Sequence, residues 1–415
     1  MPASKRTGRR AVITGVGVVA PGGIGTKAYW ALLADGRSAT RTITHFDASP
    51  YRSRVAGECD FDPLREGLSP REIRGLDRAS QFAVVAAREA VCTSGLEFAR
   101  LDPRRIGVVL GCAVGGMTRP DPALDAASRG YDYVTPNAIA AELASRVGVL
   151  GPVRAVSTGC TSGTDSVGRA AALVTGGSAD VVVTGGTEAP LAPVTMVCFD
   201  IIRATSTSND DPAHACRPFD RNRDGVVLAE GAAVLIVEEL QHARRRGAHV
   251  YAEVTGYATR WDPYYTASLD REGNRLAEAI EAAMRAARID PSMLDYVNAH
   301  GSGSVWDDLR ETRAFKRSLG RYAHSTPVSG IKSMIGHSLG AAGSLEIAGC
   351  LLAFEEGVIA PTANLHEPDP RCDLDYVPLV AREQRVDTAL TVATGFEGIQ
   401  SALVLQRSAP GATPG

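Results

Sequence analysis

Short runs of β-branched and apolar residues alternate with alanine-rich segments of helical periodicity along most of the chain. The apolar runs of the first half are AVITGVGVV (11–19), IGVVLGCAVGG (106–116), DVVVTGGTE (180–188) and AAVLIVEE (232–239). Those of the second half are VYAEVTGYA (250–258), YVNAHGSGS (296–304), TPVSGIKS (326–333), TVATGFEG (391–398) and SALVLQR (401–407). Nearly continuous apolar strands are typical of sheets covered by helices on both faces. The pattern therefore predicts an α/β fold.

The two sets of strands are similar in number and order, although no exact sequence repeat is visible. This similarity predicts two related α/β halves, residues 1–248 and residues 249–408. The final segment, residues 409–415, has no pattern of apolar residues able to pack, and we expect a loose tail there.

The composition excludes several classes of function. The 415 residues carry a formal net charge of −3, which gives no indication of a nucleic-acid partner. No segment approaches the roughly 18 consecutive apolar residues of a membrane span, so we expect no membrane insertion. The eight cysteines form no CxxC pair and have no histidines at metal-ligand spacing, so we expect neither a disulfide framework nor a metal site.

The amino terminus imitates a secretory signal, because basic residues precede a short apolar run. That run, AVITGVGVV, ends in a Pro-Gly-Gly turn and has no small-x-small cleavage site after it. It is more typical of a first core strand, and we expect a cytoplasmic protein.

One cysteine has a distinctive setting. Cys160 stands in VSTGCTSGTDSVGRA (156–170), after an extended segment and before a helical pattern formed by Val167, Ala171 and Val174. Unpaired backbone N–H groups and the helix dipole at such a turn favour the thiolate, which is the nucleophilic form. The alternative, a buried cysteine that packs as a small hydrophobic residue, stays open on the pattern alone.

Two histidines share the setting of Cys160. His300 follows an apolar run and precedes a glycine-serine loop, and His337 lies between Gly336 and Ser338 before another helical pattern. Each histidine taken singly is also compatible with a structural role. Together with Cys160, and without a metal or nucleotide motif, they indicate acyl transfer through a thioester.

The helix after His337 carries a further anomaly. It is apolar nearly all round, which predicts burial, yet Glu346 lies in its middle. A buried carboxylate needs a cation or several donors, and Lys332 at the end of the preceding strand is the candidate. The pair is either a structural ion pair or an organising element near the histidines.

Four motifs in this order resemble those of the β-ketoacyl synthases: STGCTSG (157–163), RPFDRNRDGVVLAEGAA (217–233), NAHGSGS (298–304) and GIKSMIGHSLGAAGSLE (330–346). The cysteine motif is most similar to that of the ketosynthase α subunit of bacterial type II polyketide synthases. The resemblance implies a thiolase-like fold, with two similar halves in a five-layer αβαβα arrangement. It also implies decarboxylative Claisen condensation, in which an acyl chain on the cysteine is extended by malonyl bound to an acyl carrier protein.

The resemblance also implies roles for individual residues. Cys160 would be the nucleophile, and its amide would form an oxyanion hole with that of Phe396. His300 and His337, neutral and donating, would stabilise the enolate oxygen. The remaining matches are the buried pair Lys332 and Glu346, the acidic positions Asp308 and Glu311, and the acyl-pocket residues Phe199 and Val226. No tightly bound cofactor and no metal are implied, because the carrier protein brings the phosphopantetheine arm.

Several positions depart from the family pattern. Glu397 replaces a glycine in the late loop, Val226 replaces a phenylalanine, and the stretch 117–131 is shorter than usual. These departures leave aromatic, reduced and polyene products open.

The partner expected from the resemblance is a homologous chain-length subunit that lacks the cysteine, joined across residues 111–131. An elongating synthase of fatty-acid synthesis, working as a homodimer, is the alternative. A non-catalytic chain-length subunit is disfavoured by Cys160, and an initiating synthase by the second histidine motif.

Overall fold

The computed structural model describes residues 8–116, 135–263 and 270–408, and one large mixed β-sheet runs through both halves of the chain. The order of the main strands is β12-β11-β15-β16-β10-β1-β9-β7-β5-β6. The strands of the N-terminal half are β1 (Ala11–Ala20), β5 (Ile106–Gly111), β6 (Val153–Val156), β7 (Val181–Glu188) and β9 (Gly231–Glu239). Those of the C-terminal half are β10 (Ala252–Trp261), β11 (Tyr296–Asn298), β12 (Val328–Ser329), β15 (Thr388–Thr394) and β16 (Ile399–Arg407).

The helices follow the alanine-rich segments of the sequence. The N-terminal half contains α1 (Thr26–Ala34), α2 (Pro70–Gly75), α3 (Arg78–Ser94), α4 (Pro136–Val147), α5 (Ser162–Thr175), α6 (Pro193–Ile201) and α7 (Leu240–Arg245). The C-terminal half contains α8 (Asn274–Ala287), α9 (Val305–Leu319), α10 (Lys332–Ile335) and α11 (Ala342–Glu356). Single 3₁₀ turns, η4 (Gly159–Thr161) and η8 (Leu339–Ala341), directly precede α5 and α11.

Short strands lie outside the main ladder. β2 (Gly23–Ile24) pairs with β1, while β3 (Arg41–Thr42), β4 (Val55–Gly57) and β8 (Leu228–Ala229) form a small sheet. β13 (Val358–Ile359) pairs with β14 (Arg382–Glu383).

The pairing pattern of the first half is repeated in the second. In the first half β5 is parallel to β6 and β7, and β9 is antiparallel to both β7 and β1. In the second half β11 is parallel to β12 and β15, and β16 is antiparallel to both β15 and β10. The halves join where β1 pairs with β10 at Val12↔Glu253 and Ile13↔Ala252. Two halves of the same topology confirm the predicted α/β duplication, while the exact boundary at residues 248 and 249 stays a prediction.

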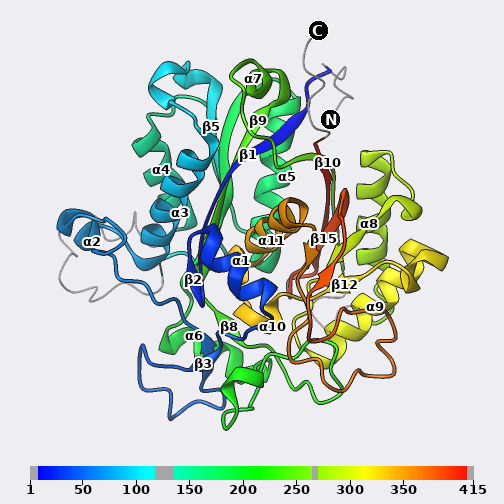
Figure 1. Ribbon diagram of the computed structural model, residues 1–415. Coiled ribbons are helices and arrows are strands. Elements are labelled where there is room, and N and C mark those ends of the chain that lie inside the picture. The colour runs from blue at the N-terminus through cyan, green and yellow to red at the C-terminus, as the bar shows by residue number, and fades with distance from the viewer. Residues whose placement is uncertain (1–7, 117–134, 264–269, 409–415) are drawn as a thin grey trace.

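The helices form three layers, and α5 and α11 occupy the middle one (Figure 1). α5 packs against β5 and β7 of its own half and against β10 and β16 of the other. α3 and α4 cover the outer face of the first half, and α8 and α9 that of the second. Because both of its sides are covered, α11 is buried along nearly its whole length, which explains its almost uniformly apolar sequence. The five-layer αβαβα expectation is confirmed.

Some strands end elsewhere than the apolar pattern predicts. The run 106–116 is a strand only to Gly111, because the amides of Ala113 and Val114 turn to the carboxylate of Glu188 instead of extending the ladder. The predicted tail 409–415 and the shortened stretch 117–131 lie outside the described residues.

Candidate active site

Cys160 lies in the 3₁₀ turn η4 that connects β6 to α5 in the middle layer. The residue is only 6% exposed, so protein atoms surround it almost completely. The preceding residue, Gly159, has φ +59° and lies under the carboxylate of Glu397, which a Cβ at that position would meet at 2.2 Å. The positive φ therefore favours glycine in this turn, whereas the contact with Glu397 involves only the end of a flexible side chain.

Both histidines belong to the C-terminal half. His300 lies two residues after β11, and His337 lies between α10 and η8. Their rings are nearly perpendicular, at 84°, with centroids 5.1 Å apart. A small cavity brings them together with Cys160, and its other lining residues are Ser302, Asp307, Thr394 and Phe396.

A buried lysine fixes the orientation of His300. The ammonium of Lys332 forms an ion pair with Glu346, donates to the His300 carbonyl at 2.5 Å, and lies 3.3 Å from His300 Nδ1. Since the ammonium can only donate, Nδ1 accepts and the ring proton is assigned to Nε2. Lys332 and Glu346 thus organise a histidine as well as neutralising each other.

Burial keeps both imidazoles neutral. It lowers the pKa of His300 well below its usual value, and Lys332 and His337 lower it further. It also lowers the pKa of His337, again with help from Lys332. A neutral imidazole with its proton on one nitrogen is the form expected of a hydrogen-bond donor to a developing oxyanion.

The environment of Cys160 differs from the sequence-based expectation. Burial, with a smaller contribution from the carboxylate of Glu397, raises the pKa of its thiol to about 12, and Lys332 opposes the shift. Desolvation of the sulfur therefore acts against the thiolate that the helix N-terminus is expected to favour, and the reactivity of Cys160 stays a prediction.

Asp308 and Glu311 act on the backbone of the His300 loop. The Glu311 carboxylate accepts from the amides of His300 at 2.5 Å and Gly301 at 2.9 Å. Asp308 accepts from the amides of Phe219 and Gly303, and Arg223 lies 3.3 Å from it. Both carboxylates shape the loop that carries His300.

The predicted pocket residues share an apolar cluster with Cys160. Val226 is fully buried in this cluster, and Phe199 and Phe396 pack against it. The rings of Phe199 and Phe396 lie 6.2 Å apart. The two sides of the site are thus a polar face with the histidines and an apolar face suited to an acyl chain.

Sequence reasoning missed two buried carboxylates beside the site, Glu188 and Asp165. Glu188 accepts from the amides of Ala113, Val114 and Gly340 and from the thiol of Cys112. A glutamate at the end of the otherwise apolar run DVVVTGGTE was a signal that could have identified it. Asp165, five residues after Cys160, accepts only from hydroxyl groups.

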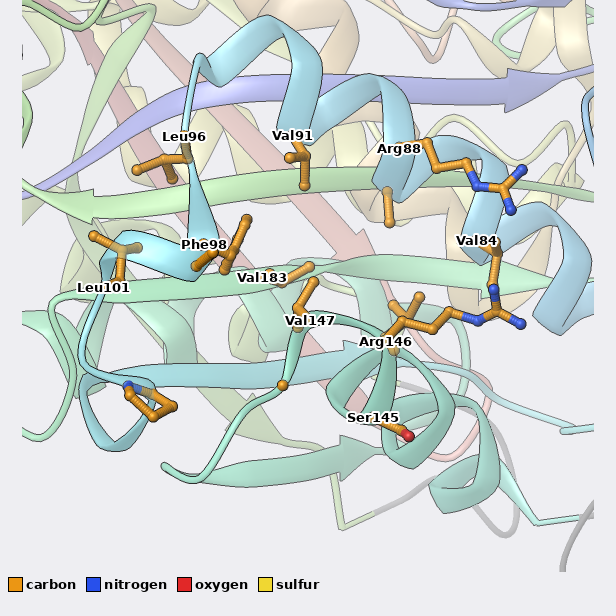
Figure 2. Close-up of a pocket in the computed structure, with 15 residues that line it drawn as sticks. Val84, Arg88, Val91, Leu96, Phe98, Leu101, Ser145, Arg146, Val147 and Val183 are labelled. Atoms are coloured by element: carbon orange, nitrogen blue, oxygen red, sulfur yellow. The ribbon is translucent and has the colours of Figure 1, made fainter.

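A larger groove of about 890 Å³ lies elsewhere, between α3, α4 and β7 (Figure 2). Its walls are mainly apolar, with Val84, Val91, Phe98 and Val147 among them, and it contains neither cysteine nor histidine. Its one serine, Ser145, has no histidine or carboxylate among the lining residues to act as a base, so the smaller cavity at Cys160 is the candidate site.

The described ranges contain neither a metal centre nor a membrane-spanning helix. No group of three or more histidine, cysteine or acidic residues there is arranged to hold a metal ion. None of the helices in the same ranges has the length and apolar character needed to cross a membrane.

Comparison with known proteins identifies the family to which the chain belongs. The model described as "Beta-ketoacyl synthase, N-terminal domain" matches residues 8–243, and its C-terminal counterpart matches residues 251–366. The chain therefore belongs to the β-ketoacyl synthase family, whose members are acyltransferases that form carbon–carbon bonds.

The relatives narrow the class further. The tetracenomycin polyketide synthase ketoacyl synthase alpha subunit of Streptomyces glaucescens is 59% identical over 414 residues, which cover 96% of this chain and 97% of the relative. A solved type II polyketide synthase acyl-carrier protein in complex with its ketosynthase matches with a TM-score of 0.87 and 34% identity. The ishigamide ketosynthase/chain length factor matches with a TM-score of 0.87 and 31% identity. Each structural match covers 97% of this chain and 100% of the other. The predicted resemblance to type II polyketide ketosynthase α subunits is confirmed.

Proposed function

We propose that this chain elongates an acyl chain by decarboxylative Claisen condensation with malonyl bound to an acyl carrier protein. The observation that carries the proposal is the meeting of Cys160, His300 and His337 around one cavity, with Cys160 and Phe396 also belonging to an apolar cluster. The carrier protein brings the phosphopantetheine arm, so the chain itself needs no bound cofactor.

In the first half-reaction Cys160 takes the acyl group. Its sulfur bonds to the thioester carbonyl carbon, the bond to the phosphopantetheine sulfur breaks, and that sulfur leaves with the proton lost by Cys160. The amides of Cys160 and Phe396 would stabilise the tetrahedral oxyanion. The apolar cluster around Val226 and Phe199 would hold the acyl chain.

In the second half-reaction malonyl loses carbon dioxide and its thioester becomes an enolate. His300 Nε2–H and a ring nitrogen of His337 would donate to the enolate oxygen. The enolate carbon then bonds to the acyl carbonyl carbon, and the Cys160 sulfur leaves as a thiolate that regains a proton. The product is a β-ketoacyl thioester on the carrier protein, two carbons longer.

The test is a condensation assay with acyl-loaded and malonyl-loaded carrier proteins, following carbon dioxide release and the mass of the product. Cys160→Ala should abolish acyl loading and elongation. Cys92→Ala, which removes an exposed cysteine on α3, is the matched control and should retain both. Elongation by the Cys160→Ala variant would contradict the proposal.

We also propose a homologous subunit without the cysteine as the partner, and a cytoplasmic location. All eight cysteines are free thiols, which supports a reducing compartment. Exposed apolar surface supports the partner subunit. β6 is an edge strand of the sheet, and Leu150, three residues before it, is 72% exposed. Helix α6 also exposes Val194, Val197 and Ile201. Of the interface region predicted at residues 111–131, only 111–116 are described.

A further inference from the structure

Asp165 is a buried carboxylate that the proposed chemistry does not use. It lies in the first turn of α5 and is 1% exposed. One oxygen, Oδ2, accepts from the hydroxyls of Thr158 at 2.6 Å and Thr161 at 2.8 Å. The other, Oδ1, accepts from Tyr257 at 2.9 Å and Ser401 at 2.6 Å. Four hydroxyl groups therefore converge on one carboxylate.

The two oxygens serve different parts of the molecule. Thr158 and Thr161 flank Cys160 in the turn that presents the nucleophile. Tyr257 lies on β10 and Ser401 on β16, both strands of the C-terminal half. Asp165 thus connects the turn of Cys160 directly to the sheet of the half that carries the histidines.

The hydrogen-bond partners of Asp165 exclude an ordinary helix-capping role. A carboxylate in the first turn of a helix commonly accepts from backbone amides or interacts with the helix dipole at the surface. Asp165 instead accepts from side-chain hydroxyls, and its hydrogen bonds in the described structure include no backbone amide. A buried carboxylate persists only when its acceptor capacity is filled. The hydroxyls of Thr158, Tyr257 and Ser401 donate to Asp165, while the single proton of the Thr161 hydroxyl is shared between Asp165 and the Thr158 carbonyl, each 2.8 Å away.

Close packing places Tyr257 against the helix. A Cβ at Gly168, three residues after Asp165, would lie 2.4 Å from the Tyr257 ring. Glycine at this position lets the ring pack across α5, with its hydroxyl on the carboxylate. The geometry of the contact is therefore determined by packing as well as by hydrogen bonds.

We propose that Asp165 is a positioning residue that holds the Cys160 turn at a fixed place relative to strands β10 and β16. The inference rests on the proposed function, since it takes Cys160 as the nucleophile. Asp165 does not line the cavity, so its effect is on the rate of acyl transfer to Cys160 and not on substrate affinity.

The test measures acyl loading of Cys160 from an acyl thioester by rapid quench and intact-protein mass spectrometry. In Asp165→Asn an amide nitrogen replaces one acceptor oxygen, so one pair of hydroxyls loses its acceptor. The saturating loading rate should fall about tenfold or more, with little change in the half-saturating thioester concentration. Ser166→Ala is the matched control: its equally buried hydroxyl donates to Gly163 and Gly185 carbonyls and has no contact with Thr158 or Thr161.

A second pair of variants keeps the test valid if Asp165→Asn fails to fold. Thr158→Val removes the hydroxyl while keeping the shape, and should slow loading, whereas Thr158→Ser keeps the hydroxyl and should restore it. Normal loading by Asp165→Asn, or an equal loss in Ser166→Ala at a matched melting temperature, would overturn the inference. Failure of the wild-type protein to load Cys160 at all would instead reject the proposed function.

Discussion

At the scale of single residues, the buried site holds Cys160 as a thiol beside two neutral histidines. Desolvation accounts for both states, because it disfavours the charged thiolate and the charged imidazolium alike. The charged groups that act on the sulfur are Lys332 on one side and the carboxylates of Glu397 and Asp307 on the other. Such a site suits an acyl thioester, which is neutral, and reserves its donors for the oxyanion formed during reaction.

The first prediction concerns the pH dependence of Cys160 alkylation. Only the thiolate reacts, and the pKa of about 12 lies far above neutral pH. The rate with iodoacetamide should therefore rise about tenfold per pH unit from about pH 7 to pH 9, with no plateau. Peptide mass spectrometry measures it, with the exposed Cys92 in the same sample as the reference for the reagent. A plateau below pH 9 would show that the thiol ionises more readily than its burial implies.

The second prediction isolates Glu397, whose carboxylate raises the pKa of Cys160. Glu397→Gln removes the negative charge and keeps the size of the side chain, so the pKa should fall and alkylation at a fixed pH should become faster. Glu355→Gln, at an exposed position on α11, should change nothing. Identical rates in the Glu397→Gln and wild-type proteins would place the carboxylate away from the sulfur in solution.

The third prediction separates the roles of the histidines. His300→Ala or His337→Ala should leave acyl loading of Cys160 largely intact and slow decarboxylation on the order of a hundredfold or more, because an oxyanion donor is lost. Loading is read by intact mass and decarboxylation by carbon dioxide release. His249→Ala, at an exposed histidine, is the control. If loading fell as much as decarboxylation, the histidines would act on the thiol instead.

At the scale of elements, the fourth prediction concerns Glu188, which ties three segments together. Its carboxylate joins the loop after β5 to the start of η8 through backbone amides. In Glu188→Gln an amide N–H₂ would face those N–H donors, so buried donors would lose their acceptor. We expect the free energy of unfolding to fall by about 1–3 kcal/mol, measured by denaturant unfolding. The surface variant Glu355→Gln loses only a partly exposed contact with His249, worth about 0–1 kcal/mol, and should unfold nearly like the wild type. Equal stability of both variants would refute the role of Glu188.

The sequence predicted the elements better than their contacts. AVITGVGVV became β1 and the segment after Cys160 became α5, because a continuous apolar run and helical spacing report local burial directly. The run at 250–258 was misplaced, since β10 extends to Trp261 by pairing with β16. The link from Asp165 to Ser401 spans 236 positions, and no local pattern encodes such a contact. The effect of burial on the pKa of the Cys160 thiol was not predicted for the same reason, because burial arises only in the assembled fold.

At the scale of the whole molecule, the duplication explains where the site lies. α5 and α11 are equivalent helices packed together in the middle layer, and each is preceded by a 3₁₀ turn. Cys160 stands in the first of these turns and His337 just before the second. The site therefore lies between the halves: the N-terminal half contributes the nucleophile, and the C-terminal half contributes both histidine donors.

The fifth prediction is about the partner subunit. The stripe of Val194, Val197 and Ile201 on α6 is apolar and 44% to 75% exposed, so the lone chain should self-associate and gain stability when a homologous subunit without the cysteine is co-expressed. Val197→Glu with Ile201→Glu should weaken that association, because it places charges in an interface that must lose water. Met293→Glu, at a 45% exposed apolar residue outside the stripe, should leave it unchanged. Light scattering and an elongation assay distinguish the cases, and a stable homodimer that extends acyl chains alone would reject the heterodimer and favour the fatty-acid type of synthase.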